Sequence, residues 1–194
     1  MHKFHRTLAI LLIISLALGA GFLTDLLWNK IEEWGHPQSY DEIVAKYAKE
    51  YNIPEYVIYA VIKTESGFDP KARSSANAIG LMQMTPIAHV DTLEVIQDGT
   101  VFSDLYDPET NIRHGTCYLQ MMYRLFDYDW DLAFAAYNAG PGNVSEWLED
   151  PEYTDSEGNL IKIPFSETKS YVSKVNKAMN TYKNLYYANG GNKS

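Results

Sequence analysis

The sequence predicts an all-α fold, and three observations support that prediction. Apolar residues recur at helical spacing over most of the chain. No segment shows the alternation of apolar and polar residues that is typical of a strand. Helix-capping residues followed by proline stand at Thr85-Pro86 and Asp107-Pro108. The 194 residues suit one such domain with a short extension.

The composition argues against some partners and fits others. The net charge of −9 makes a nucleic-acid partner improbable. Fifteen tyrosines against seven phenylalanines supply rings with polar tips, which suit sugar-binding clefts as well as half-buried cores. The single Cys117 has no partner for an internal disulfide. His89 and His114 are far apart in sequence and no ligand set clusters, so we predict no metal site.

The first residues predict a membrane anchor or a signal peptide. A strongly apolar run without charges spans residues 7–24, after the basic Lys3 and Arg6. Its length is near the lower limit for a membrane span, about 17–20 residues, and near the upper end for a signal-peptide core. Apolar character resumes at residues 26–28, which favours an uncleaved anchor over a cleaved signal. In both cases the positive flank stays inside and the rest of the chain is exported.

Residues 25–38 are expected to form a stalk after the anchor, which we place at residues 1–24. Leu27, Ile31 and Trp34 share one helical face, suited to lie on a membrane surface. A glycine and Pro37 then interrupt the chain, and this interruption predicts a domain boundary.

The predicted domain covers residues 39–187, and a disordered tail is expected at 188–194. Ser39 and Glu42 have the spacing of a capping box. This spacing predicts that the first helix of the domain starts at Ser39.

A carboxylate interrupts the apolar face of the next helix, which is predicted after Pro54. The face has residues at positions i, i+3, i+4 and i+7: Ile58, Val61, Ile62 and Glu65. Burial disfavours the charged form of Glu65, and so does the helix C-terminus, which Gly67 is expected to cap. Both effects raise its pKa, as a general acid near neutral pH requires. The helix alone also allows an exposed glutamate, or one paired with Lys63 or Lys71.

Further helices are predicted from capping signals and apolar spacing over residues 85–97, 107–126, 130–139, 143–148 and 166–186. The small, polar segment 71–80 is expected to form a loop against the end of the helix that bears Glu65. Residues 149–163 are polar and rich in turn residues, which predicts an exposed loop or a small hairpin.

Four short motifs, in order along the chain, resemble the catalytic domain of soluble lytic transglycosylases, which are goose-type-lysozyme-like glycosidases of glycoside hydrolase family 23. They are Glu65-Ser66, Gly80-Leu81-Met82-Gln83, Ala136-Tyr137-Asn138, and Glu167-Thr168 followed by Tyr171. The resemblance covers about residues 39–187. It implies a lysozyme-like helical domain.

The resemblance also implies an activity on peptidoglycan glycan strands. The expected reaction cleaves the β-1,4 bond between N-acetylmuramic acid and N-acetylglucosamine, and leaves a 1,6-anhydromuramic end. Ordinary glycosidases use two carboxylates, but Glu65 is the one good candidate in this sequence. Asp69 precedes Pro70 in a predicted turn and is expected to be structural. In the family a single glutamate acts as acid and then as base, so no metal or cofactor is expected.

Site residues follow from the family motifs position by position. Glu65 takes the role of the acid and then of the base. The residues implied in holding the substrate or orienting the carboxyl group are Ser74, Gln83, Tyr137, Asn138 and Tyr171. A buried acid needs such hydrogen-bonding partners to fix its position.

Structural roles are alternatives for several of these residues. Gln83 could tie down a loop, Asn138 could cap a helix, and Ser75 could replace Ser74. For the whole domain, the alternatives are a muramidase like goose-type lysozyme and a non-enzymatic peptidoglycan-binding module. The preferred hypothesis is an extracytoplasmic lytic transglycosylase held at the membrane by its N-terminal segment.

Overall fold

The computed structural model describes residues 2–188, except for the side chains of residues 2–4, 6–14, 25, 26 and 29. The described chain divides into two compact units, one ending at Pro37 and the other starting at Gln38. The tail predicted to be disordered lies outside the described residues from position 189 onward.

The first unit is the helix α1 (His2–Gly35), which is followed by a break at residues 36–38. Leu27, Ile31 and Trp34 are all strongly exposed on it. Among the side chains that the structure describes, none of the helices has a stretch long and apolar enough to cross a membrane. The apolar run predicted as an anchor includes residues 7–14, whose side chains lie outside the described part.

The second unit consists of helices, and this confirms the all-α prediction for the described residues, which contain isolated β-bridges but no strand. In order, the elements are α2 (Asp41–Tyr51), α3 (Glu55–Glu65), α4 (Pro86–Ile96), the 3₁₀ helix η1 (Phe102–Tyr106), α5 (Pro108–Leu125), α6 (Trp130–Ala139), α7 (Pro141–Glu149), α8 (Ser166–Tyr182) and the π-helical turn η2 (Lys183–Tyr187).

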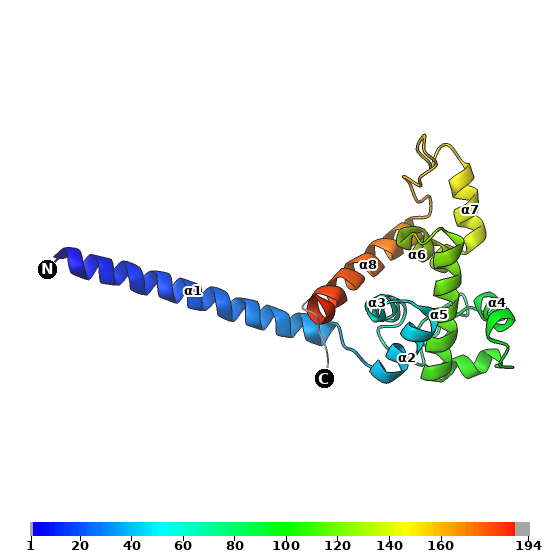
Figure 1. Cartoon of the computed structure of the whole chain (residues 1–194), viewed down its shortest axis with the longest axis horizontal. Helices are drawn as coiled ribbons and strands as arrows, with labels where there is room; N and C mark the ends of the chain where they lie inside the picture. Colours follow the sequence, from blue (N-terminus) through cyan, green and yellow to red (C-terminus); the bar gives the residue numbers. More distant parts are fainter. Residues whose placement is uncertain (1, 189–194) are drawn as a thin grey trace. The chain divides into compact units, whose positions relative to one another are not determined.

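Helix α3 forms the centre of the core. Its residues 57–62 are all completely buried, which includes the predicted apolar face at Ile58, Val61 and Ile62. Helix α3 packs against α8 and α2, while α6 packs against α5, α7 and α8 (Figure 1). Burying each such aliphatic side chain contributes about 1.5–3 kcal/mol relative to exposure. The core therefore fixes the position of the C-terminal end of α3, where Glu65 lies.

The capping prediction at Ser39 is wrong. Helix α2 starts at Asp41 after Tyr40, whose backbone has a left-handed φ of 64° and whose side chain forms no capping hydrogen bond. The carbonyl of Tyr40 accepts the first helical bond from Val44 N at 2.8 Å, so Ser39 lies one residue outside the cap. Asp41 and Glu42 in the first turn offset the helix dipole in its place.

The other capping predictions agree with the structure more closely. Thr85 Oγ1 accepts from Ala88 N at 3.1 Å, and Asp107 Oδ1 accepts from Thr110 N at 2.9 Å. Helix α7 starts two residues before the predicted Asn143, because the chain enters it directly at a proline after Gly140. The segment predicted as a loop or small hairpin has one antiparallel bridge, between residues 154 and 160.

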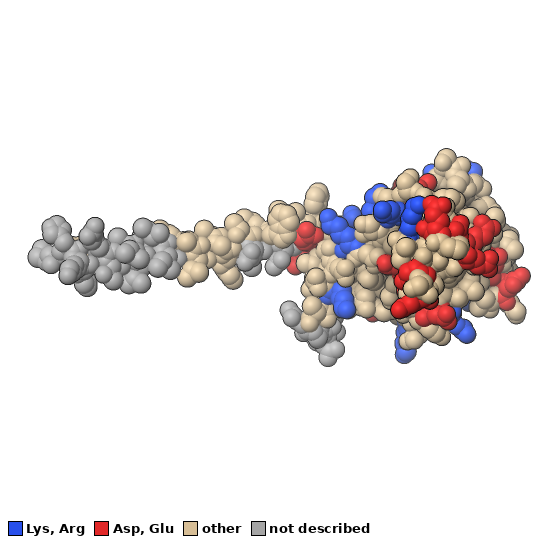
Figure 2. All heavy atoms as spheres, turned by 90° about the horizontal axis from the view of Figure 1, so that it is seen from above, with Lys and Arg blue, Asp and Glu red and all other residues tan. Residues whose placement is uncertain are grey.

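The surface of the second unit reflects the acidic composition. On the face drawn in Figure 2, Asp and Glu side chains form a broad group, with Lys and Arg gathered mainly toward its edges. This distribution fits the net charge of −9.

Candidate active site

Glu65 is the last residue of α3 and lies three residues after the end of the fully buried segment 57–62. Gly67, two residues on, has a φ of 60°, the left-handed conformation expected after a helix end. Burial raises the pKa of the Glu65 carboxyl to about 7. Its side chain is thus held on the rigid central helix and titrates near neutral pH, as expected for a general acid.

Tyr171, on α8, faces this carboxyl. Its hydroxyl lowers the pKa of Glu65, in opposition to the larger effect of burial. Burial and then the charge of Glu65 raise the pKa of Tyr171 well above its ordinary value. Within the described chain the buried hydroxyl makes no hydrogen bond of standard geometry, so the contact with Glu65 is close but not ideally aligned. A hydroxyl in this position is a donor for the charged form of the carboxyl group.

Tyr137, on α6, approaches Glu65 from a third helix. Burial and then the charge of Glu65 raise the pKa of Tyr137 well above its ordinary value. Its hydroxyl donates to the Met82 carbonyl at 2.8 Å and also lies 3.6 Å from Met84 Sδ. A tyrosine hydroxyl has one proton, so with that proton on Met82 it presents a lone pair to any other neighbour.

The loop between α3 and α4 is held by a buried asparagine that the sequence analysis did not single out. Asn111 Nδ2 donates to the carbonyls of Ile79 at 3.0 Å and Leu105 at 2.7 Å, and its Oδ1 accepts from Met82 N at 2.7 Å. Asn111 is completely buried on α5. Asn111 lies four residues before Gly115, so both residues are on the same buried face of α5. A polar residue on such a face is the signal that could have identified Asn111 from the sequence.

A second clamp joins this loop to the end of α3. Ser66 Oγ donates to the Leu81 carbonyl at 2.8 Å and accepts from Phe68 N at 3.1 Å. Gly115 permits the loop to approach α5, since a Cβ there would lie 2.5 Å from Met82 Sδ. The backbone of residues 80–84 is therefore fixed beside the end of α3 from two sides.

Gln83 and Ser74 have structural contacts in this loop. Gln83 has a φ of 48°, and its Nε2 donates to the carbonyls of Gly80 at 2.9 Å and Ala72 at 3.2 Å. Ser74 is exposed, and its Oγ accepts from Ala78 N at 3.1 Å. No hydrogen bond within the described chain joins either side chain to Glu65. Gln83 thus ties down the loop with its amide nitrogen and keeps its Oε1 for another partner.

Asn138 connects two of the helices that surround the site. Its Oδ1 accepts from Thr168 Oγ1 on α8 at 2.8 Å. It is not the cap of α6, because that position belongs to Gly140. A hollow of about 610 Å³ is lined by residues 138–139 and 164–168, next in sequence to both tyrosines of the site.

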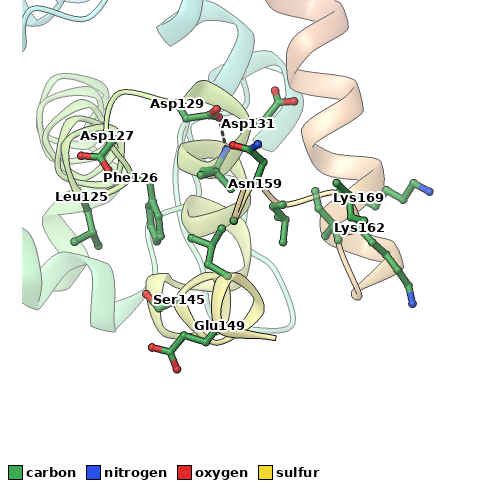
Figure 3. Close-up of a pocket in the computed structure, with 16 residues that line it drawn as sticks. Leu125, Phe126, Asp127, Asp129, Asp131, Ser145, Glu149, Asn159, Lys162 and Lys169 are labelled. Carbon is green, nitrogen blue, oxygen red and sulfur yellow. Dashed lines mark hydrogen bonds between the residues drawn. The ribbon is translucent and has the colours of Figure 1, made fainter. Parts of the chain in front are cut away.

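A different hollow of about 900 Å³ lies between the end of α5, the start of α6, α7 and residues 158–163 (Figure 3). None of the site residues predicted from the sequence lines it. Figure 3 shows Glu149, Lys162 and Lys169 with their charged ends pointing away from its centre. The perturbed pKa of Glu65, and not the size of a hollow, therefore marks the candidate active site.

The histidines come together despite their distance in sequence. The rings of His89 and His114 lie 5.2 Å apart, and His114 contacts Thr92 at 2.8 Å and Asp98 at 3.2 Å. Hydrogen bonds, from Thr100 first and then from His114, hold the pKa of Asp98 at about 2 against the opposing effect of burial. Among the described side chains, no three His, Cys, Asp or Glu residues are arranged to hold a metal ion. The cluster fastens the segment after α4 to α5.

Fold and site together define a helical domain with a single candidate general acid on its central helix. The family model of the transglycosylase SLT domain matches residues 42–159, more than half of the chain. The chain belongs to this family, as the sequence motifs indicated.

Named relatives agree with this assignment. The chain is 38% identical over 152 residues to the soluble lytic murein transglycosylase of Escherichia coli (strain K12), which covers 77% of this chain and 23% of that protein. It is 29% identical over 183 residues to the membrane-bound lytic murein transglycosylase C of Salmonella typhi, with 82% of this chain and 50% of that protein covered. The chain therefore spans about a quarter of the length of the soluble relative and half that of the membrane-bound one.

Solved structures share the fold. The 70 kDa soluble lytic transglycosylase of Escherichia coli superimposes with a TM-score of 0.72 at 35% identity, over 79% of this chain and 25% of that one. An inactive mutant of lytic transglycosylase Slt from Pseudomonas aeruginosa superimposes with a TM-score of 0.69 at 33% identity. The match covers 77% of this chain and 24% of that one. The prediction of a lysozyme-like helical domain is confirmed by these likenesses.

Proposed function

We propose that this protein is a peptidoglycan lytic transglycosylase that cleaves the β-1,4 bond between N-acetylmuramic acid and N-acetylglucosamine. The observation that carries the proposal is the partly buried Glu65 with a pKa of about 7, at the end of the central helix of an SLT domain. The names of the relatives, which are murein transglycosylases, support the same substrate.

One carboxyl group is sufficient for this reaction. Protonated Glu65 gives its proton to the glycosidic oxygen as the bond from C1 to that oxygen breaks. The resulting carboxylate then takes the proton of the muramic C6 hydroxyl, whose oxygen bonds to C1 and forms the 1,6-anhydro ring. Among the described residues no second carboxylate shifts the pKa of Glu65. Asp69 closes a turn by accepting from Lys71 N at 2.9 Å, in agreement with a structural role.

The two tyrosines have different roles in this cycle. Burial favours the protonated Glu65 that starts the reaction, and Tyr137, whose hydroxyl donates to the Met82 carbonyl at 2.8 Å, holds residues 80–84 in place. Tyr171 offers its proton, so it favours the carboxylate that acts as the base. The geometry supports Asn138 as a contact to the glycan. It supports Gln83 as a second contact, through its free Oε1. Ser74, at the loop tip, would be a more distant contact to the glycan.

The first experiment is mass spectrometry of purified peptidoglycan digested with the full-length chain and with Glu65→Gln. We expect anhydromuropeptides from the wild type and none from the variant, which differs by one isosteric group. Reducing-end muropeptides from the wild type would indicate a muramidase instead. Binding to peptidoglycan without release of any sugar would indicate a non-enzymatic binding module.

We further propose that residues 1–24 anchor the protein in the membrane, that residues 25–38 form a stalk, and that the domain acts outside the cytoplasm. The positive flank and apolar run support the anchor, and the exposed Trp28 and Trp34 suit the water–lipid interface. The full-length chain should stay with membranes after an alkaline wash, whereas residues 38–194 exported with a cleavable signal should be released. Release of both would contradict the anchor.

A further inference from the structure

A small hollow of about 280 Å³ lies at the other end of α3 from Glu65. It is formed where α2 ends, α3 begins and α5 turns toward α6; its lining includes Tyr51, Asn52, Gln120, Tyr123, Arg124 and Tyr128. Helix α3 has 11 residues, and at 1.5 Å per residue about 16 Å of helix separates its two ends. The hollow is therefore distinct from the candidate active site.

One wall of this hollow is a column of aromatic rings that is rooted in the core. Tyr123 stacks on Trp130 with centroids 3.8 Å apart and an angle of 12°, and Trp130 stacks on the buried Phe134 at 5.4 Å. Tyr128 meets Tyr123 edge to face at 5.3 Å. It is the outermost ring and is 62% exposed. The column thus presents a large aromatic side chain to solvent on a rigid base.

The backbone holds Tyr128 in this position in an uncommon conformation. Asp127 and Tyr128 have successive left-handed φ values of 50° and 64°. Residues other than glycine rarely adopt this conformation, because the Cβ atom then lies too close to the following carbonyl oxygen. Tyr128 N donates to the Tyr123 carbonyl at 2.8 Å, which closes the end of α5 and compensates part of this strain.

The rim of the hollow is polar, and its groups are not engaged with the protein. The side chains of Asn52, Gln120 and Arg124 make no hydrogen bond or ion pair to any residue that the structure describes. No Asp or Glu lines the hollow, although the chain has a net charge of −9. These side chains leave two amide groups and a guanidinium available to a neutral or anionic ligand.

We propose that this hollow is a second saccharide-binding site, which takes one N-acetylhexosamine of a glycan strand. A β-1,4-linked pyranose has C–H groups on its faces and hydroxyls around its edge. The aromatic face of Tyr128 packs against the C–H groups, and the amides of Asn52 and Gln120 bond the hydroxyls. The volume is at the lower end for a small-molecule site, which suits one sugar ring. Arg124 suits the lactyl carboxylate of a muramic unit that carries no stem peptide.

This proposal rests on the proposed function, because it supplies a second contact to the same polymer. A strand held at this site raises the effective concentration of its other units at Glu65. The site touches no reacting atom. It should therefore matter for long, insoluble glycan and not for short soluble fragments.

The test uses the full-length chain carrying Glu65→Gln, in a sugar-free detergent, with triacetylchitotriose as the probe. Two tryptophan indole signals in ¹H–¹⁵N NMR spectra report the two sites separately. Trp130 belongs to the aromatic column, and Trp147 lies 5.0 Å from Phe165, which lines the hollow beside Asn138. We expect both signals to shift with added sugar.

Variants then assign the shift of Trp130. In the Glu65→Gln background, a second substitution, Tyr128→Ala or Gln120→Ala, should weaken the sugar affinity reported by Trp130 about fivefold or more. The affinity reported by Trp147 should stay unchanged. Tyr128→Phe keeps the ring and should retain binding. Leu125→Ala, which removes a 56% exposed side chain at the same helix end but outside this hollow, is the matched control.

The outcomes separate this proposal from the proposed function. A shift of Trp147 without a shift of Trp130 would overturn the second site and leave the catalytic proposal intact. In the active background, Tyr128→Ala should slow release from intact peptidoglycan at least about threefold and leave cleavage of short soluble glycan unchanged. Equal rates on intact peptidoglycan would also overturn the second site. Loss of all anhydro products from the wild type would contradict the catalytic proposal, whereas the Trp130 response would still decide the second site.

Discussion

At the scale of single residues, the position that makes Glu65 a candidate general acid also makes it a source of instability. Burial raises its pKa from 4.5 to about 7. Between these two values the folded state binds more protons than the unfolded state, so the free energy of unfolding decreases as pH rises, by at most about 3 kcal/mol. Below pH 4.5 both states are protonated, and above pH 7 the loss is complete.

Glu65→Gln should therefore stabilise the protein at high pH. The neutral amide avoids the burial of a charge, so we expect a higher melting temperature than wild type at pH 8 and an equal one at pH 4. Scanning calorimetry at both pH values measures this difference. Equal melting temperatures at pH 8 would show that the carboxylate is well solvated, and would remove the basis for its raised pKa.

Tyr171→Phe should move the pH dependence of activity. The Tyr171 hydroxyl lowers the pKa of Glu65, so its removal should shift the basic limb of kcat/KM to higher pH, by roughly 0.5–1 unit. The release of soluble muropeptides as a function of pH measures this. Tyr59→Phe is the matched control, because Tyr59 also has a buried hydroxyl without a partner in the described chain. A limb that stays in place in Tyr171→Phe would contradict the assigned role.

At the scale of elements, the loop between α3 and α4 depends on α5 for its shape. Asn111→Ala would leave the carbonyl of Leu105 and the N–H of Met82 without the partner that Asn111 provides. The carbonyl of Ile79 would lose one of two donors and keep the bond from Met84 N at 3.0 Å. Each buried group left unpaired costs about 1–3 kcal/mol. We expect the variant to lose about 2 kcal/mol or more in urea unfolding.

The same variant should lose activity under conditions where it is still folded, because residues 80–84 lie beside Glu65 through the bond from Tyr137 to Met82. Asn176→Ala is the control, since its amide bonds Asp131 at the surface and should cost less than about 1 kcal/mol. Equal losses in the two variants would contradict a special role for Asn111.

At the scale of the whole molecule, the second unit contains its own core. All of the described buried hydrophobic residues belong to residues 44–182. Residues 38–194 alone should therefore unfold cooperatively, at a melting temperature within about 2 °C of that of the full chain, as circular dichroism would show. A non-cooperative transition would mean that α1 contributes to the fold.

The sequence by itself determined the all-α class, the approximate extent of the helices and the family. These features depend on interactions over a few residues: the spacing of Ile58, Val61 and Ile62, and the caps at Thr85 and Asp107. It also indicated the raised pKa of Glu65, because an acid on a buried stripe at a helix end follows from local position alone. The roles of Glu65 and of the other five site residues stay predictions.

Only the tertiary structure decided which groups surround the acid. Tyr137 and Tyr171 are far from Glu65 in sequence and meet it because α3, α6 and α8 pack together. The same is true of Asn111, whose contacts to the loop residues Met82 and Ile79 lie 29 and 32 residues away. Local spacing carries no information on such pairs. The packing of helices fixes them, and that packing depends on the shapes of all the buried side chains at once.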